Sequence, residues 1–243
     1  MSAKLTGRFV ELKSEAQSDL QSLHRARERL VAARTALINH LRSLLLERGI
    51  IVPQGRRKLE RALPEILTNA SLGASVRMRQ LVADLREEWR ALDERIAAFD
   101  DELASIARTD EAARRLTTIP GIGPINATAL VAAVGDGSAF AAGRDMAAWL
   151  GLVPRQQTTG GRPRLLGISK RGNRHLRKNL IHGARSVLPV LAQTDSPLGR
   201  WLAGLSARVH KNKVVVALAN KLARIALRCL LAPSPPEIGS TAC

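Results

Sequence analysis

The chain has no tyrosine and only three phenylalanines and three tryptophans among its 243 residues. Without tyrosine, this polypeptide cannot carry out DNA chemistry through a tyrosyl-phosphate intermediate. With so few aromatic side chains, it is also not expected to bind single strands on stacked aromatic platforms. Its two cysteines, Cys229 and Cys243, are too few for a disulfide framework or a metal cage.

Long apolar runs are also absent. No uninterrupted apolar segment reaches the ~18 residues that a membrane span needs, and the first residues lack the apolar stretch of a secretion signal. We therefore expect a cytoplasmic protein with no membrane partner. Its hydrophobic content of 45% is enough for a packed core.

Positive charge is abundant and concentrated in one part of the chain. The 38 Lys and Arg exceed the 21 Asp and Glu, for a formal charge of +17. Residues 154–228 contain 16 basic side chains and one acidic side chain, whereas residues 1–153 contain 22 and 19. Neighbouring like charges cost stability unless counter-ions or phosphates neutralise them. The block predicts a nucleic-acid surface, and a merely solvated basic face is the alternative.

Two long amphipathic helices are predicted before this block. Between residues 14 and 48, apolar residues recur every three or four positions and form a stripe along one side of the helix, the seam. Arg27 and Arg34 occupy two positions of this seam where an apolar residue would be expected. A break with glycine and proline follows, and a second apolar stripe runs from Met78 to Ile106. With a connection of about 25 residues, this pattern favours an antiparallel coiled-coil hairpin. Two helices of an ordinary bundle would fit the pattern as well.

A short segment rich in proline and glycine, residues 116–135, resembles a helix-hairpin-helix motif. Gly121 and Gly123 allow the backbone to approach a ligand, and a helix of small residues begins directly afterwards. Backbone N–H groups at the start of that helix could then point at a phosphate. A corner between two helices that only packs is the alternative reading.

The predicted functional surface lies in two loops, residues 155–164 and 167–173. Both loops are rich in Gly, Thr, Ser and Arg, a composition that favours neither a helix nor a buried core. These residues offer hydroxyls, free backbone amides and guanidinium groups that can bind phosphate. The predicted DNA-binding residues there are Arg155, Gly160, Gly161, Arg162, Arg164, Lys170 and Arg171. The helix expected over residues 174–191 adds Arg174 and Arg177 on its outer side. The alternative is that these loops are basic segments exposed to solvent without a ligand. On the helix over residues 174–191, His175 and His182 alone do not make a metal site.

Five ordered blocks resemble the insertion-sequence-110 family of bacterial transposases (IS116/IS110/IS902 type). They read HRARERL…RTALINHLR…G (24–49), IPGIGPINATALVAAVGD (119–136), AAWLGLVPRQQTTGG (147–161), GISKRGNRHLRKNLIHGAR (167–185) and VVVALANKLARIA (214–226). The likeness covers about residues 8 to 231. The likeness is specific to this family because all five blocks occur in the same order along the chain.

The resemblance implies a function and a set of partners. Such proteins combine a RuvC-like domain bearing four metal-binding acidic residues, a coiled coil, and a transposase domain with a nucleophilic serine, and they recombine DNA under the guidance of an element-encoded RNA. It therefore implies double-stranded DNA, a guide RNA, a homo-oligomer formed through the coiled coil, and a nucleoid-associated location. Because the chain starts at the coiled coil, we expect the RuvC-like domain to be missing, and Mg²⁺ to be needed only with that domain.

The chain departs from the family at the nucleophile. Relatives commonly carry Ser followed by Ser or Thr before Gly-Gly, and the matching positions here are Thr158 and Thr159. Threonine keeps the hydroxyl, but its methyl group stiffens χ1 and crowds an in-line attack on phosphorus. Ser169 is the fallback nucleophile.

The sequence thus predicts an all-α protein with a coiled-coil arm over residues 1–110, a compact helical strand-transfer domain with the helix-hairpin-helix-like motif over residues 111–231, and a disordered tail over residues 232–243. The predicted function is that of an insertion-sequence transposase, as an N-terminally truncated copy with a hydroxyl nucleophile. The alternative is a non-catalytic nucleic-acid-binding remnant that can bind or inhibit an intact transposase.

Overall fold

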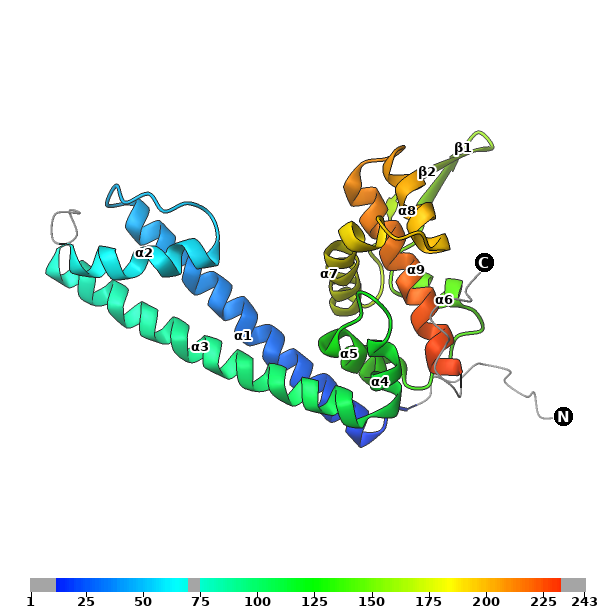
Figure 1. Cartoon of the computed structure of the whole chain (residues 1–243), viewed down its shortest axis with the longest axis horizontal. Coiled ribbons are helices and arrows are strands. Elements are labelled where there is room, and N and C mark those ends of the chain that lie inside the picture. Colours follow the sequence, from blue (N-terminus) through cyan, green and yellow to red (C-terminus); the bar gives the residue numbers. More distant parts are fainter. Residues whose placement is uncertain (1–11, 70–74, 233–243) are drawn as a thin grey trace. The chain divides into compact units, whose positions relative to one another are not determined.

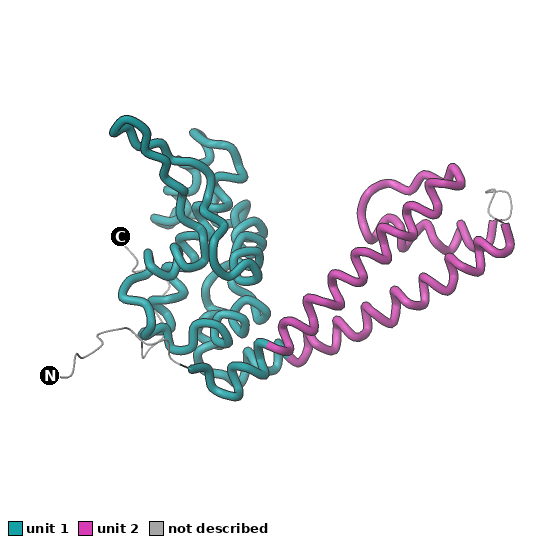
Figure 2. Tube along the Cα trace, turned by 180° about the vertical axis from the view of Figure 1, so that it is seen from behind, with its two compact units in different colours: residues 1–21, 103–243 teal, residues 22–102 magenta. Residues whose placement is uncertain are grey.

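The computed structural model describes residues 12–69 and 75–232. The chain divides into two compact units, shown in Figure 2: unit 1 comprises residues 1–21 and 103–243, and unit 2 comprises residues 22–102. Helices dominate both units, which confirms the predicted all-α class apart from one small sheet. Apart from Ala232, the predicted tail lies outside the described residues, and so does Cys243.

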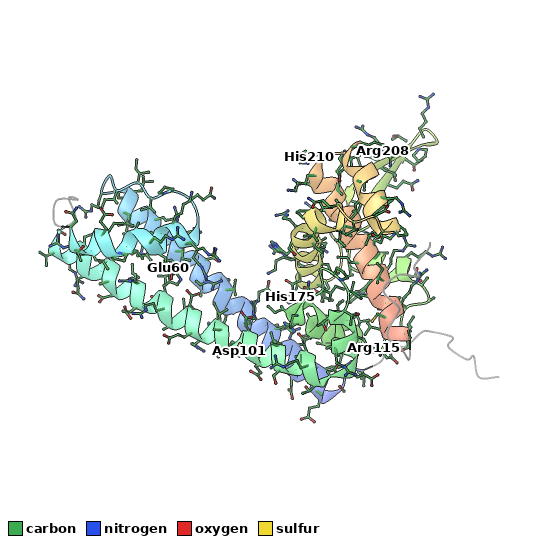
Figure 3. All side chains as sticks on the ribbon, in the orientation of Figure 1. Glu60, Asp101, Arg115, His175, Arg208 and His210 are labelled. Carbon is green, nitrogen blue, oxygen red and sulfur yellow. The ribbon has the colours of Figure 1, made fainter. Side chains whose placement is uncertain are left out.

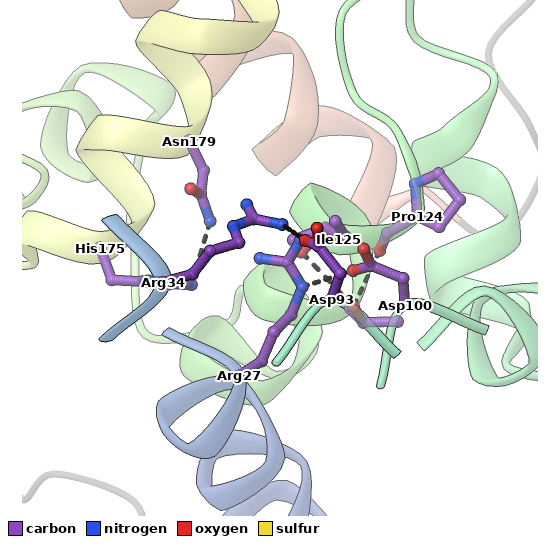
Figure 4. Close-up of polar contacts among 9 residues, drawn as sticks. Arg27, Arg34, Asp93, Asp100, Pro124, Ile125, His175 and Asn179 are labelled. Atoms are coloured by element: carbon purple, nitrogen blue, oxygen red, sulfur yellow. Dashed lines mark hydrogen bonds and ion pairs between the residues drawn. The ribbon is translucent and has the colours of Figure 1, made fainter. Parts of the chain in front are cut away.

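Unit 2 is built on two long helices, α1 (Glu15–Leu46) and α3 (Val76–Thr109), which lie side by side and run in opposite directions (Figures 1 and 2). Two ion pairs link them, from Arg27 to Asp100 and from Arg34 to Asp93 (Figure 4). The two arginines are seven residues apart and so are the two aspartates. The two charged seam positions seen in the sequence are therefore each matched by an acid on the facing helix.

A third helix, α2 (Arg56–Thr68), occupies the predicted connection. Gly55 and Pro64 predict a break in this stretch, but Gly55 precedes the helix and Pro64 lies inside it. Its apolar residues are buried with those of α1 and α3, so the connection contributes to the core instead of only linking the two long helices. The core of unit 2 consists of Leu37, Leu41, Leu45, Leu59, Leu63, Ile66, Val82 and Trp89.

Unit 1 is organised around its last helix. Its helices are α4 (Glu111–Thr117), α5 (Pro124–Val134), α6 (Gly143–Trp149), α7 (Arg174–Leu191), α8 (Pro197–Ser206) and α9 (Lys211–Leu231). Ten residues of α9 are buried, and α4, α6, α7 and α8 all pack against it. The Asp110, Asn173 and Ser196 side-chain oxygens accept N–H groups in the first turns of α4, α7 and α8, and the His210 ring accepts the Asn212 N–H at the start of α9. Within the described ranges, no helix is long and apolar enough to cross a membrane.

Candidate nucleic-acid interface

Residues 154–168 form a β-hairpin, which corrects the prediction of a loop over 155–164. β1 (Pro154–Thr159) pairs with β2 (Arg162–Ile168) in antiparallel register, and the hairpin projects from the helices of unit 1 (Figure 1). Gly160 and Gly161 connect the strands with φ of 55° and 75°, the left-handed backbone that a type I′ turn requires. All of β1 is exposed, so no buried face imposes strand alternation on the sequence. The Gly-Gly pair was the signal that could have revealed the hairpin.

The strand register brings one predicted nucleophile together with two predicted phosphate ligands. Thr159 is opposite Arg162, and Gln157 is opposite Arg164. Directly opposed residues share a face of a β-ribbon, and so do alternate residues along one strand. One face of the hairpin therefore carries Thr159, Arg162 and Arg164.

The other predicted nucleophile is on the opposite face. Thr158 is paired with Pro163, and Gln156 is paired with Leu165, whose side chain is 69% exposed. The Gln156 amide donates a hydrogen bond of 3.2 Å to the Thr158 hydroxyl oxygen. A ligand lying flat on one face of the hairpin would thus meet only one of the two threonine hydroxyls.

The base of the hairpin is fixed by backbone contacts. The Ser169 N–H donates to the Val153 carbonyl at 2.8 Å, and the Lys170 N–H donates to the Gly151 carbonyl at 3.1 Å. Ser169, the fallback nucleophile, is half-buried at this base and not on the projecting part. Lys170 has a left-handed backbone with φ of 56°, which is uncommon for a residue with a side chain.

Two glycines make the close approach at the base possible. A Cβ on Gly151 would lie 2.0 Å from the Arg171 carbonyl oxygen, and one on Gly172 would lie 1.8 Å from that of Trp149. Both distances are far inside van der Waals contact, so any side chain there would force the two backbone segments apart. The segments before and after the hairpin are therefore interlocked.

Arg177 has a packing role, which corrects its prediction as a DNA-binding residue. It was predicted to bind DNA from the outer side of its helix, but it is only 9% exposed. Its Nη1 donates to the carbonyls of Leu150 at 2.9 Å and Arg171 at 3.0 Å, which ties α7 to both segments at the base of the hairpin. From α9, the Asn220 amide donates to the Leu152 carbonyl at 3.2 Å. Both residues hold the base in place from the helical core.

The predicted helix-hairpin-helix segment corresponds to α4, a tight turn and α5. Gly121 has φ of 91° and packs against α7, where a Cβ on Gly183 would lie 1.9 Å from the Gly121 carbonyl oxygen. The Asn126 amide donates to that oxygen and to the Asn179 carbonyl. Gly123, in contrast, is exposed as the N-cap of α5, with open space where a Cβ would be. Of the two glycines, Gly123 is the one whose backbone faces outward.

The other predicted cations are at the surface. Those with exposed side chains are Arg155, Arg162, Arg164, Lys170, Arg171 and Arg174. Arg208 and His210 are exposed at the α8–α9 junction and belong to none of the predicted site motifs (Figure 3).

No metal site is evident in residues 12–69 and 75–232, where no three His, Cys, Asp or Glu side chains gather in a suitable arrangement. His175 instead contacts Asn179, with 3.0 Å between its Nε2 and the amide nitrogen. The pKa of Asp136 is lowered because the Ser138 backbone N–H and hydroxyl both donate to its carboxylate. That carboxylate closes the turn after α5.

Comparison with known proteins relates this architecture to mobile elements. The chain is 46% identical over 219 residues to a Pseudomonas aeruginosa protein named as a family 20 transposase, covering 90% of this chain and 65% of the relative. It is 42% identical over 218 residues to the transposase for insertion sequence element IS1111A of Coxiella burnetii, covering 90% and 60%. To the transposase for insertion sequence element IS1328 of Yersinia enterocolitica it is 40% identical over 218 residues, covering 90% and 64%.

The chain thus spans less than two thirds of the length of each of these relatives. Residues 113–196, which run from α4 to the start of α8 and include the β-hairpin, match the model of the family described as Transposase IS116/IS110/IS902. Over residues 113–196 the chain therefore carries a transposase domain of the IS116/IS110/IS902 family, and 90% of its length is similar to proteins named as transposases.

Proposed function

We propose that this chain binds double-stranded DNA through unit 1 and takes part in transposition of an insertion sequence. The observation that carries the proposal is the exposed β-hairpin, because one face combines the Thr159 hydroxyl with the guanidinium groups of Arg162 and Arg164. Arginine suits phosphate because its planar fork can donate two hydrogen bonds to one group. The interlocked base supports a catalytic role, since strand transfer requires a well-positioned nucleophile.

Thr159 is the nucleophile in this proposal. Its oxygen forms a bond to a DNA phosphorus while the bond from that phosphorus to one bridging oxygen breaks. The hydroxyl proton ends on the leaving oxygen, so one DNA end is esterified to the protein and the other carries a free hydroxyl. Arg162 and Arg164 would stabilise the charge that develops on the phosphoryl oxygens.

The proposal also involves components that the described residues do not provide. A RuvC-like domain would supply acidic ligands for Mg²⁺, and the ion would supply Lewis-acid activation of the phosphodiester there. A guide RNA would select the target, and self-association would run through unit 2. This chain's own part is to hold the DNA and present the hydroxyl.

The test is a covalent adduct assay. The chain is incubated with a RuvC-like partner, Mg²⁺ and a nicked DNA substrate, and attached DNA is detected after denaturing electrophoresis. Thr159→Val removes the hydroxyl at nearly unchanged shape, so we expect it to abolish the adduct while DNA retention persists. Thr158→Val is the matched control on the other face and should keep the adduct. An adduct that survives Thr159→Val but disappears with Thr158→Val would reverse the assignment.

The second candidate function is a nucleic-acid-binding protein without catalysis that inhibits an intact transposase. The β-branched threonines at both nucleophile positions favour it, because their methyl groups crowd an in-line attack. If no adduct forms with any variant while a serine-bearing relative reacts under the same conditions, this function holds and the catalytic one fails. In either case, about six phosphate contacts should give a log–log salt slope near −5, at ~0.9 per phosphate.

A further inference from the structure

Unit 2 carries its positive charge at one end. We define the α2 end as residues 42–69 and 75–80, which contain eight basic and three acidic side chains. The remaining residues of unit 2, 22–41 and 81–102, contain seven basic and nine acidic side chains. The near balance of charge over residues 1–153 conceals this separation.

Three of the cations at the α2 end, Arg42, Arg56 and Arg79, already have structural partners. The Arg42 guanidinium donates to the carbonyls of Val52, Pro53 and Gly55 and so holds the connection between α1 and α2. Arg56 donates to Asp93 of α3 at 3.1 Å. None of these arginines is therefore the best candidate for an external ligand.

The outer face of α2 is different. Leu59, Leu63 and Ile66 point into the core with exposed fractions of 0%, 0% and 5%. At 100° per residue, Arg57 and Arg61 project from the opposite side of the helix, one turn apart. Both are exposed, and neither forms an ion pair within the described residues.

This arrangement costs stability in the chain alone. Like charges at i and i+4 repel each other, and the basic residues in the first turn of α2 oppose the positive end of its dipole without an acidic residue among them. The seam arginines of α1, in contrast, each face an aspartate. A ligand with closely spaced negative charges would offset both penalties at α2.

We infer that the outer face of α2, with Arg57 and Arg61 at its centre and Lys58 beside them, binds the phosphodiester backbone of a nucleic acid. A duplex presents about one negative charge per 1.7 Å of axis, which suits cations repeated along a helix. The described residues of the α2 end include no aromatic side chain, so contact is with the backbone and not by base stacking. This surface lies in unit 2 and is additional to the hairpin surface proposed for unit 1.

The test uses the full chain and fluorescence anisotropy with two probes, a 30-base-pair DNA duplex and a hairpin RNA, over a range of salt concentrations. The variant Arg57→Glu/Arg61→Glu is compared with Arg29→Glu/Arg95→Glu, which makes the same charge change at exposed helical positions of unit 2 away from the α2 end. Loss of two phosphate contacts should make the salt slope shallower by about 2 for at least one probe. The control should keep the slope of the unaltered chain.

Each outcome decides the inference. A changed slope with DNA, with RNA or with both supports it and identifies the source of the phosphates. Equal slopes for the two variants with both probes overturn it, and an acidic protein partner then becomes the better reading. Arg57→Gln/Arg61→Gln gives a second measure if charge reversal unfolds the chain. Arg162→Glu/Arg164→Glu tests the hairpin surface separately, so failure of one proposal is distinguished from failure of the other.

Discussion

Arg34 of α1 and Asp93 of α3 form an ion pair at a position where the apolar seam of the two helices is interrupted. Arg56 of α2 donates to the same carboxylate at 3.1 Å, so Asp93 joins all three helices of unit 2. One heptad away, Arg27 and Asp100 form the corresponding pair, with no third charged partner among residues 12–69 and 75–232. A charged residue in the seam thus fixes which positions of α1 and α3 face each other.

This difference predicts unequal costs for removing the two aspartates. Asp93→Ala leaves two arginines without their acceptor and should lower the free energy of unfolding by about 1–2 kcal/mol, after allowance for the 34% exposure of the Asp93 side chain. Asp100→Ala should lower the free energy of unfolding by about half as much, because Asp100 pairs with one arginine. Urea unfolding of both variants measures the coupling in double-mutant cycles, with Arg34→Ala added to Asp93→Ala and Arg27→Ala added to Asp100→Ala. Equal costs would contradict the three-helix role of Asp93.

The seam also shows what the sequence could and could not predict. Spacing alone identified both long helices and the places of Arg27 and Arg34, because a heptad is a local pattern. It did not reveal α2, because Pro64 inside the helix and Gly55 before it gave the signals of a loop. Nor could it show that these arginines face acids, since ion pairing between residues 59 and 73 positions apart depends on the tertiary fold.

The candidate site was predicted in composition but not in geometry. The crowded glycines, threonines and arginines marked the right segment, yet the division of Thr158 and Thr159 between two faces follows from the hairpin register. Arg177 was assigned to the surface because arginine usually ends in solvent. It is buried because its guanidinium donates hydrogen bonds to the carbonyls of Leu150 and Arg171.

Because the Cys229 thiol is buried in the core of unit 1, we expect the free energy of unfolding to decrease at alkaline pH. Burial raises the pKa of Cys229 above its usual 9.0, against the opposing effect of the Arg115 charge. The folded state therefore keeps the proton that the unfolded state loses, and this contribution to stability is complete below the pKa of the unfolded thiol and decreases as the pH rises above about 9. In a Cys243→Ser chain, iodoacetamide should not label Cys229 at neutral pH without denaturant. Rapid labelling of the folded chain would show that the thiol is accessible.

Two helical glycines should respond in opposite directions to alanine. Gly183→Ala places a methyl group 1.9 Å from the Gly121 carbonyl oxygen and forces α7 away from the turn before α5, so it should destabilise by about 1–3 kcal/mol. Gly204→Ala in α8 meets nothing within 4 Å and should stabilise by about 0.5–1 kcal/mol through helix propensity. Thermal unfolding of the two variants compares them directly. If Gly183→Ala is also stabilising, the close contact of α7 with this turn is wrong.

The last prediction concerns the base of the hairpin. Arg177→Ala leaves the carbonyls of Leu150 and Arg171 without their side-chain donor in a buried position, which should cost about 2–4 kcal/mol. Arg177→Lys keeps the charge but lacks the fork, so it should recover only part of the loss. Arg174→Ala, at an exposed position of the same helix, is the matched control and should change stability by no more than about 0.5 kcal/mol. Chemical denaturation measures all three variants, and equal effects of Arg177→Ala and Arg174→Ala would show that the buried guanidinium does not hold the base.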